Sequence, residues 1–194
     1  MSRKAEVRRE TGETDVTVVL DLDGSGNVEV ATGLGFLDHM ISALGKHSGC
    51  DLSMRAMGDT AVDDHHTVED AAIVLGRALD QALGDRSGIV RFGSAYVPLD
   101  ESLSRAVVDL SGRAWPEINI SFSRDMVGDV ATENIVHFFR SLAVEGRMAL
   151  HVDLIRGDND HHKAESAFKA VARALRAAVE IRGAGVPSTK GSLG

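Results

Sequence analysis

The chain has 194 residues, a formal net charge of −8 and 43% hydrophobic residues. This length suits one sizeable domain or two small ones that share a core. The negative charge disfavours a general binder of nucleic acid or of anionic membranes, because it opposes attraction to phosphate. Cys50 is the only cysteine, which excludes an intrachain disulfide and a thiolate metal cluster within one chain.

The first half of the chain is predicted to hold four strands and two helices. Alternating apolar and polar residues predict three strands, at 4–10, 15–22 and 27–30. Apolar residues at helical spacing then predict a helix at 35–48. A strand at 51–57 and a longer helix from about His65 to Leu83 follow. The order is β-β-β-α-β-α.

The second half repeats this order after "GDRSG". Three strands are predicted, at 89–99, 102–110 and 117–122. A helix at 131–146, a strand at 148–155 and a helix from about His161 to Glu180 complete the half. The sequence has no apolar run near the roughly 18 residues of a membrane span. Its charged start lacks the apolar core of a signal peptide. We therefore expect a cytoplasmic protein.

A constant shift of 96 residues superimposes the two long helices. Apolar positions coincide, but Ala- and Leu-rich amphipathic helices often resemble one another. A repeated His-His-x-x-Glu motif is much more specific. The motif consists of His65, His66 and Glu69 in the first helix and of His161, His162 and Glu165 in the second. We therefore infer a duplication, with one half at 1–84 and the other at 85–194, that together form one functional domain.

The spacing of the motif predicts metal ligands. Residues i and i+4 lie on one face of a helix, so the first histidine and the glutamate of each motif can bind one ion. The second histidine points about 100° away and could reach a different ion. The short helices add one histidine each, His39 and His137.

Six imidazoles and two carboxylates divide naturally into two sites, each with three imidazoles and one carboxylate. Such ligands suit Mn, Fe, Zn or Ni. Four protein ligands on an octahedral ion leave positions open for substrate, which favours a catalytic role. The spacing leaves open which histidine pairs with which glutamate.

Several polar residues are candidates for binding phosphate. The C-terminal segment "VPSTKG" offers hydroxyls, free amides and a lysine, although a flexible tail is the commoner outcome for such a segment. Arg91, Arg113 and Lys169 are further candidates, and each alone would be read as a surface charge. His47 is left undecided, and Glu13 alone would be a surface carboxylate.

The chain contains the segments "GFLDHM", "DDHHTVED", "DLSGR", "HFFRSL", "DNDHHKAESAFKA" and "GVPSTKG". Together they resemble the imidazoleglycerol-phosphate dehydratase family, in a match that runs in order from about Glu13 to Leu193. The resemblance implies an α+β fold with two tandem βββαβα half-domains, of the ribosomal protein S5 domain 2-like kind, packed into one αβ sandwich. It also implies two Mn²⁺ per subunit and a homo-oligomer, a 24-mer built from trimers. From the charge we expect binding to neither nucleic acid nor membrane.

The implied function is the metal-dependent dehydration of D-erythro-imidazole glycerol phosphate to imidazole acetol phosphate in histidine biosynthesis. The reaction would pass through an imidazolate and a diazafulvene on two metal ions. The implied metal ligands are His39, His65, His66, Glu69, His137, His161, His162 and Glu165. The implied catalytic carboxylates are Glu13, Glu69 and Glu165, with Glu13 as either acid or base. The implied substrate and phosphate contacts are Glu13, His47, Arg91, Arg113, Lys169, Ser188, Thr189 and Lys190.

Two alternatives belong to other functional classes. A metal-storage or metal-delivery protein would use the same histidines but would need neither Glu13 nor the "STKG" segment. A phosphate- or RNA-binding module could share the α+β architecture. The net negative charge and the lack of a basic, aromatic-rich face argue against that module.

Overall fold

The computed structural model describes residues 3–191 and residue 193. The first half contains β1 (Lys4–Glu10), β2 (Thr14–Asp21), β3 (Val28–Ala31), α1 (Gly35–Ser48), β4 (Asp51–Gly58) and α2 (His65–Leu83). The second half contains β5 (Phe92–Leu99), β6 (Ser102–Asp109), β7 (Trp115–Asn119), α3 (Thr132–Glu145), β10 (Ala149–Arg156) and α4 (Asp160–Ala178). A short hairpin, β8 (Met126–Val127) and β9 (Val130–Ala131), lies before α3. The main elements therefore follow the predicted β-β-β-α-β-α order twice.

The two halves form separate four-stranded sheets with the same topology. Their strand orders are β1-β2-β4-β3 and β5-β6-β10-β7. In each sheet the first two pairings are antiparallel and the last is parallel. The central strands β2 and β6 show the same alternation of buried and less buried residues. This alternation places one face of each sheet against the helices.

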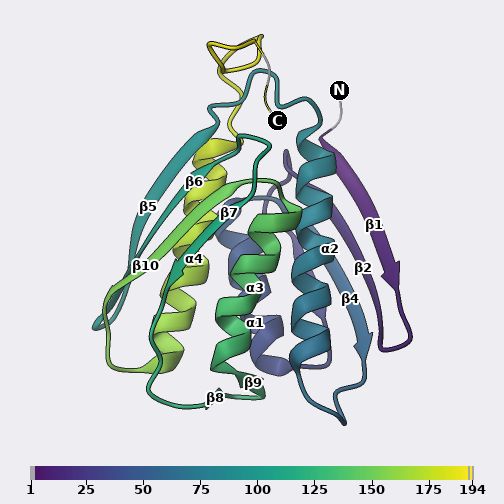
Figure 1. Cartoon of the computed structure of the whole chain (residues 1–194), viewed down its shortest axis with the longest axis vertical. Coiled ribbons are helices and arrows are strands. Elements are labelled where there is room, and N and C mark those ends of the chain that lie inside the picture. The colour runs from purple at the N-terminus through teal and green to yellow at the C-terminus, as the bar shows by residue number, and fades with distance from the viewer. Residues whose placement is uncertain (1–2, 192, 194) are drawn as a thin grey trace.

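The four helices lie between the two sheets, which makes the fold an α+β sandwich (Figure 1). α2 packs on β1 and β2, whereas α4 packs on β5 and β6. The short helices cross over: α1 packs against α4, and α3 packs against α2. The core is shared by both halves, since Phe138 and Phe139 of α3 contact Phe168 of α4 with ring centroids 5.1 and 4.5 Å away. The expected αβ sandwich is confirmed.

Gly76 allows α2 and α3 to approach closely. A Cβ atom at Gly76 would lie 2.8 Å from Cβ of Glu145 and 2.9 Å from the backbone oxygen of Leu142. Both distances are shorter than real Cβ contacts, so a larger residue would push the helices apart. This contact lies between the helices that carry His65 and His137.

The structure differs from the predicted elements at a few points. The predicted strand at 89–99 begins at Phe92, because Arg91 has a positive φ of 76° that no extended strand accommodates. β7 ends at Asn119, whereas the prediction continued to 122. The β8–β9 hairpin was not predicted. Within the described residues, no helix has the length and apolar character needed to cross a membrane.

Candidate metal centres

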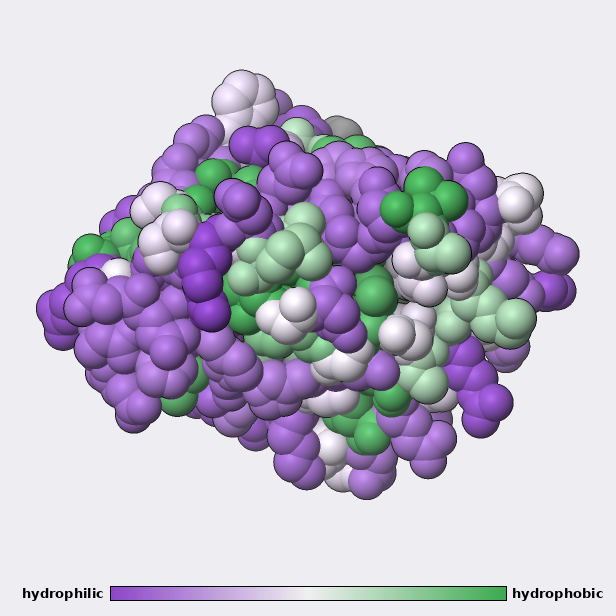
Figure 2. Space-filling view, turned by 90° about the horizontal axis from the view of Figure 1, so that it is seen from below, coloured by the Kyte–Doolittle hydropathy of each residue, from purple (hydrophilic) through white to green (hydrophobic). Residues whose placement is uncertain are grey.

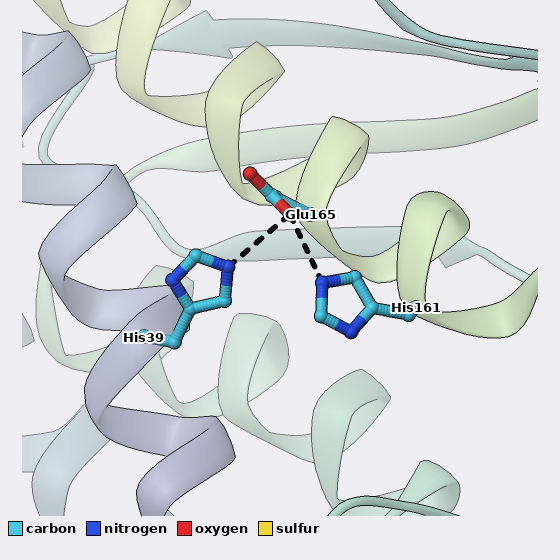
Figure 3. A group of neighbouring side chains, drawn as sticks. All are labelled: His39, His161 and Glu165. Carbon is cyan, nitrogen blue, oxygen red and sulfur yellow. Dashed lines mark hydrogen bonds and ion pairs between the residues drawn. The ribbon is translucent and has the colours of Figure 1, made fainter.

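The first candidate centre joins α1 and α4. His39 of α1 and His161 and Glu165 of α4 point toward one another, and their ligand atoms lie within 4.8 Å (Figure 3). Oε2 of Glu165 lies 3.2 Å from Nε2 of His39 and 3.1 Å from Nε2 of His161. Two imidazole nitrogens thus converge on one carboxylate oxygen.

The second candidate centre joins α2 and α3 in the same way. His65 and Glu69 of α2 and His137 of α3 place their ligand atoms within 4.8 Å of one another. Nε2 of His137 lies 2.9 Å from Oε1 of Glu69. The rings of His65 and His137 are stacked, with centroids 5.1 Å apart.

Each centre therefore combines ligands from both halves of the duplication. The long helix of one half supplies a histidine and the glutamate, and the short helix of the other half supplies the second histidine. The helix packing explains this exchange, because α1 lies against α4 and α3 lies against α2. The sequence could not decide this pairing, since both short helices precede a long helix at similar distances. Imidazole and carboxylate donors without thiolate fit a borderline divalent ion such as Mn, Fe or Zn.

The two centres differ in one neighbouring charge. Nζ of Lys169 lies 2.6 Å from Oε1 of Glu165. Burial alone would raise the pKa of Glu165, but hydrogen bonds from Lys169 and His39 outweigh it and lower the pKa to about 2. The repeat places Ile73 where α4 has Lys169, so Glu69 has no such lysine. In the second centre, Nδ1 of His65 instead lies 2.9 Å from Oδ1 of Asn134.

His66 and His162 lie outside both centres of the chain. Nδ1 of His66 is 3.1 Å from a carboxylate oxygen of Asp59. Nδ1 of His162 is 2.8 Å from Oε2 of Glu101. These contacts raise the pKa of both histidines, in each case mainly through the carboxylate hydrogen bond. A third imidazole in each centre remains a prediction, because one chain brings together only two.

Glu13 lies in the loop between β1 and β2, beside His66. Its Oε2 is 3.7 Å from Nε2 of His66, and its side chain is 57% exposed. The hydroxyl of Thr11 accepts a hydrogen bond from the backbone N–H of Glu13, which fixes the loop. The carboxylate itself is thus open to solvent at the end of the molecule where the histidines lie.

All four helices begin at the same end of the molecule, the lower end in Figure 1. The candidate ligands occupy their first two turns, so both centres lie at this end. Seen from below, the surface is mostly hydrophilic with an apolar area in its middle (Figure 2). The side chains of His39 and His161 are 49% and 41% exposed, so the first centre is accessible to a ligand.

The predicted phosphate-binding residues fall into two places. A cavity of about 600 Å³ is lined by Arg91, Phe92, Arg113, Pro187, Ser188, Thr189, Lys190 and Leu193. Arg91 is held there by Asp109, with Nε 2.6 Å from Oδ1, and by the backbone oxygen of Pro187. Lys169 lies elsewhere, beside Glu165. His47 lies close enough to Lys169 and Arg173 that their charges, together with partial burial as the main cause, lower the pKa of His47.

This cavity and the candidate centres lie at opposite ends of α4. The backbone N–H of Arg91 donates to the carbonyl oxygen of Ala178, the last residue of α4, whereas His161 is the second residue. At 1.5 Å per residue the separation along the helix is about 25 Å. Figure 1 shows the C-terminal segment above the end of α4, far from the hairpin β8–β9. One chain therefore does not bring the two sets of residues together.

Sequence reasoning missed five polar residues around the centres. Asp59, Glu101 and Asn134 each contact a histidine ring, as described above. Asp64, the residue before the first histidine pair, accepts a hydrogen bond from the backbone N–H of Ala131. Its equivalent Asp160 contacts Lys163, Ser123 and Arg124. The sequence repeats an aspartate directly before each His-His pair, and this repeat could have marked Asp64 and Asp160. No sequence pattern marks the loop residues Asp59 and Glu101.

The fold and the paired centres define a class: a duplicated α+β protein with two histidine–glutamate groups at one end. The family model described as imidazoleglycerol-phosphate dehydratase matches residues 32–175. The chain belongs to this family and is a carbon–oxygen hydro-lyase.

Similar proteins extend this match to nearly the whole chain. The imidazoleglycerol-phosphate dehydratase of Salinibacter ruber is 56% identical over 193 residues, which cover 98% of this chain and 96% of that protein. That of Phytophthora nicotianae is 58% identical over 98% of this chain, which spans only 42% of that longer protein. The crystal structure of the Staphylococcus aureus enzyme is 38% identical, with a TM-score of 0.84 over 92% of this chain and 99% of that one. That of the Pyrococcus furiosus enzyme, in complex with (S)-C348, is 35% identical, with a TM-score of 0.82 over 96% of this chain and 100% of that one.

Proposed function

We propose that this hydro-lyase dehydrates imidazole glycerol phosphate to imidazole acetol phosphate in histidine biosynthesis, and that it needs two divalent metal ions per chain, Mn²⁺ in our proposal. The observation that carries the metal dependence is the convergence of two imidazole nitrogens and a carboxylate at each of two places. The donor set fits such an ion, because it is rich in nitrogen and oxygen and lacks sulfur.

His39, His161 and Glu165 would hold one ion, and His65, Glu69 and His137 the other. His66 and His162 would complete the ligand sets. When bound, the ions would supply positive charge to the imidazole ring of the substrate, which makes the neighbouring carbon–hydrogen bond more acidic. Glu69 and Glu165 are our further candidates for catalytic carboxylates, because each would lie beside a bound ion.

Glu13 is our candidate for moving the proton. Its carboxylate is exposed at the same end as the centres and lies beside His66. A general acid–base group must reach the proton that it transfers, directly or through one water. The backbone of Glu13 is held by a hydrogen bond to the Thr11 hydroxyl, and its carboxylate would reach the substrate from beside His66.

Arg91, Arg113, Ser188, Thr189 and Lys190 would bind the phosphate of the substrate. Arginine and lysine side chains and free amides are the usual phosphate donors. Lys169 and His47 lie closer to the first centre and would meet the substrate on its other side.

This division of labour requires an assembly. The phosphate cavity and the centres of one chain are about 25 Å apart along α4, whereas the substrate is a three-carbon chain with a ring and a phosphate. A complete site therefore needs the centre of one subunit and the cavity of another. We propose a homo-oligomer, a 24-mer built from trimers, in which such contacts are satisfied.

The direct test is product formation from imidazole glycerol phosphate by the full-length chain, with and without Mn²⁺ after treatment with a chelator. We expect formation of imidazole acetol phosphate only when Mn²⁺ is restored, with two ions per chain by metal analysis. Binding of two ions without any product would favour a metal-storage protein. Full activity of the metal-free protein would refute the metal dependence.

A further inference from the structure

The strand hairpins of the two halves superimpose with a shift of 88 residues, which differs from the shift of the long helices. Lys4 pairs with Asp21 in the first hairpin, and Phe92 pairs with Asp109 in the second. This register places Glu13, in the loop between β1 and β2, on Glu101, in the loop between β5 and β6. The duplication therefore contains two equivalent loop glutamates, each beside the second histidine of a His-His pair.

The two glutamates make different contacts. Oε2 of Glu101 lies 2.8 Å from Nδ1 of His162. Its Oε1 accepts hydrogen bonds from the backbone N–H groups of Asn159 and Asp158, at 2.8 and 3.2 Å. Glu13 is 3.7 Å from Nε2 of His66, which is beyond hydrogen-bonding distance. Both carboxylate oxygens of Glu101 thus have hydrogen-bond partners, whereas the Glu13 carboxylate forms no hydrogen bond with His66.

A second difference lies after the fourth strand of each half. The pairing of Asp21 with Asp51 and of Asp109 with Ala149 aligns these strands with a shift of 98, which the irregularity between Leu154 and Arg156 raises to 99. Gly58 therefore falls on Gly157, and Asp59 falls on Asp158. A carboxylate oxygen of Asp59 lies 3.1 Å from Nδ1 of His66, whereas the backbone N–H of Asp158 donates to Glu101. In the second half Glu101 therefore takes the place of Asp59 on the histidine.

A carboxylate on Nδ1 fixes both the tautomer and the direction of an imidazole ring. The hydrogen then resides on Nδ1, and Nε2 carries the lone pair that a metal ion needs. We propose that Asp59 and Glu101 are positioning residues that hold His66 and His162 with Nε2 free for a metal ion. The same arrangement leaves Glu13, and not its counterpart Glu101, available for proton transfer. This inference rests on the metal function proposed above.

Glu101→Gln and Glu13→Gln form a matched pair, because they make the same chemical change at equivalent positions. Mn²⁺ binding to the full-length chain is measured from the signal of free Mn²⁺ by electron paramagnetic resonance. We expect Glu101→Gln to weaken one of the two ions by roughly 10- to 100-fold, as for other partners of metal-bound histidines. Glu13→Gln should leave both affinities unchanged. Excess Mn²⁺ should restore turnover in Glu101→Gln but not in Glu13→Gln.

A second readout does not depend on metal or activity. Ring ¹⁵N shifts of the metal-free protein at pH 8 should show hydrogen on Nδ1 of His66 and His162. Glu101→Gln should change the tautomer balance of His162 alone, and Asp59→Asn that of His66 alone. Asp59→Asn keeps the test valid if Glu101→Gln fails to fold. Within the described residues no backbone N–H donates to the Asp59 side chain, so the Asp59→Asn change removes no backbone hydrogen bond.

Unchanged Mn²⁺ affinity and an unchanged tautomer in both variants would overturn the positioning role. Loss of Mn²⁺ affinity in Glu13→Gln would overturn the division between the two glutamates. Failure of the proposed function would look different: wild-type protein would form no product, whereas the tautomer of each histidine would still respond to its own carboxylate.

Discussion

Lys169 is the residue that most clearly distinguishes the two candidate centres. Its ammonium group lies 2.6 Å from Glu165, and the side chains are 19% and 13% exposed. The equivalent residue in α2 is Ile73. Burial would raise the pKa of Glu165, but the hydrogen bonds from Lys169 and His39 outweigh burial and lower the pKa from 4.5 to about 2. Glu165 therefore keeps its charge in acid.

Lys169→Met should therefore reduce stability in a pH-dependent way. The stability that Glu165 gains from its partners is present above its unfolded pKa of 4.5 and is lost as the pH falls toward about 2. We expect the metal-free variant to lose about 1 kcal/mol near pH 6, and less as the pH approaches 3. Urea unfolding at both pH values measures the difference. Lys46→Met, which removes an exposed lysine, is the control, and an equal loss at both pH values would contradict the assignment.

Glu13 and Glu69 should respond differently to loss of charge. Acid–base residues typically contribute roughly 10² to 10⁴ in rate, so Glu13→Gln should lower kcat by about that factor with bound Mn unchanged. Glu69→Gln should lose metal as well as activity, because Glu69 lies within ligand distance of His137. The measurement is kcat and bound Mn in one buffer. Near wild-type turnover in Glu13→Gln would remove Glu13 from the proton transfer.

Among elements, the sequence predicted the helices best. α1 was predicted at its observed bounds, and α2 and α4 within about two residues, because an apolar periodicity marks each one and a polar segment precedes α2 and α4. Strand ends were less accurate, since the backbone conformation of Arg91 delays the start of the predicted strand to Phe92. The β8–β9 hairpin has two residues in each strand, too few to show an alternation of apolar and polar residues.

The candidate site was predictable as a set of residues but not as an arrangement. The repeated His-His-x-x-Glu motif can be recognised in the sequence alone, because the spacing of ligands along one helix is a local pattern. The assignment of His39 to Glu165, and of His137 to Glu69, depends on which helices pack together, which no local pattern encodes. Asp59 and Glu101 were missed for the same reason, since each reaches its histidine from a separate loop.

The close contact between α2 and α3 gives a prediction at the scale of elements. Gly76→Ala should destabilise the protein by about 1 to 3 kcal/mol through overpacking, although alanine favours a helix over glycine by about 1 kcal/mol. The atoms that obstruct a Cβ at Gly76 include backbone atoms of Leu142 and Gly146, which cannot rotate away. Thermal unfolding measures the effect.

Gly45→Ala is the matched control, because its close neighbours are side-chain atoms of Val28 and Leu52, which can adjust. We expect a smaller loss there. Equal stability of Gly76→Ala and wild type would show that α2 and α3 can separate without cost. The spacing of His65 and His137 would then not depend on that glycine.

At the scale of the whole molecule, both histidine–glutamate centres lie at one end and the Arg91–Lys190 cavity at the other. An interface that joins unlike ends is heterologous, and closed assemblies of such contacts follow rotational symmetry. In the assembly that we propose, the cavity end and the centre end of any one chain would therefore serve different active sites.

On this proposal, two inactive variants should repair one another. His161→Ala damages only the centre end of its own chain, and Lys190→Ala only the cavity end. If the two are unfolded, mixed equally and reassembled together, random placement gives about a quarter of sites with two intact ends. Activity should therefore appear in the mixture although neither variant is active alone, and kcat per chain measures it. No recovery in well-formed mixed assemblies would mean that each chain completes its own site. In a cell with two defective copies of the gene, the same arithmetic predicts partial growth without added histidine.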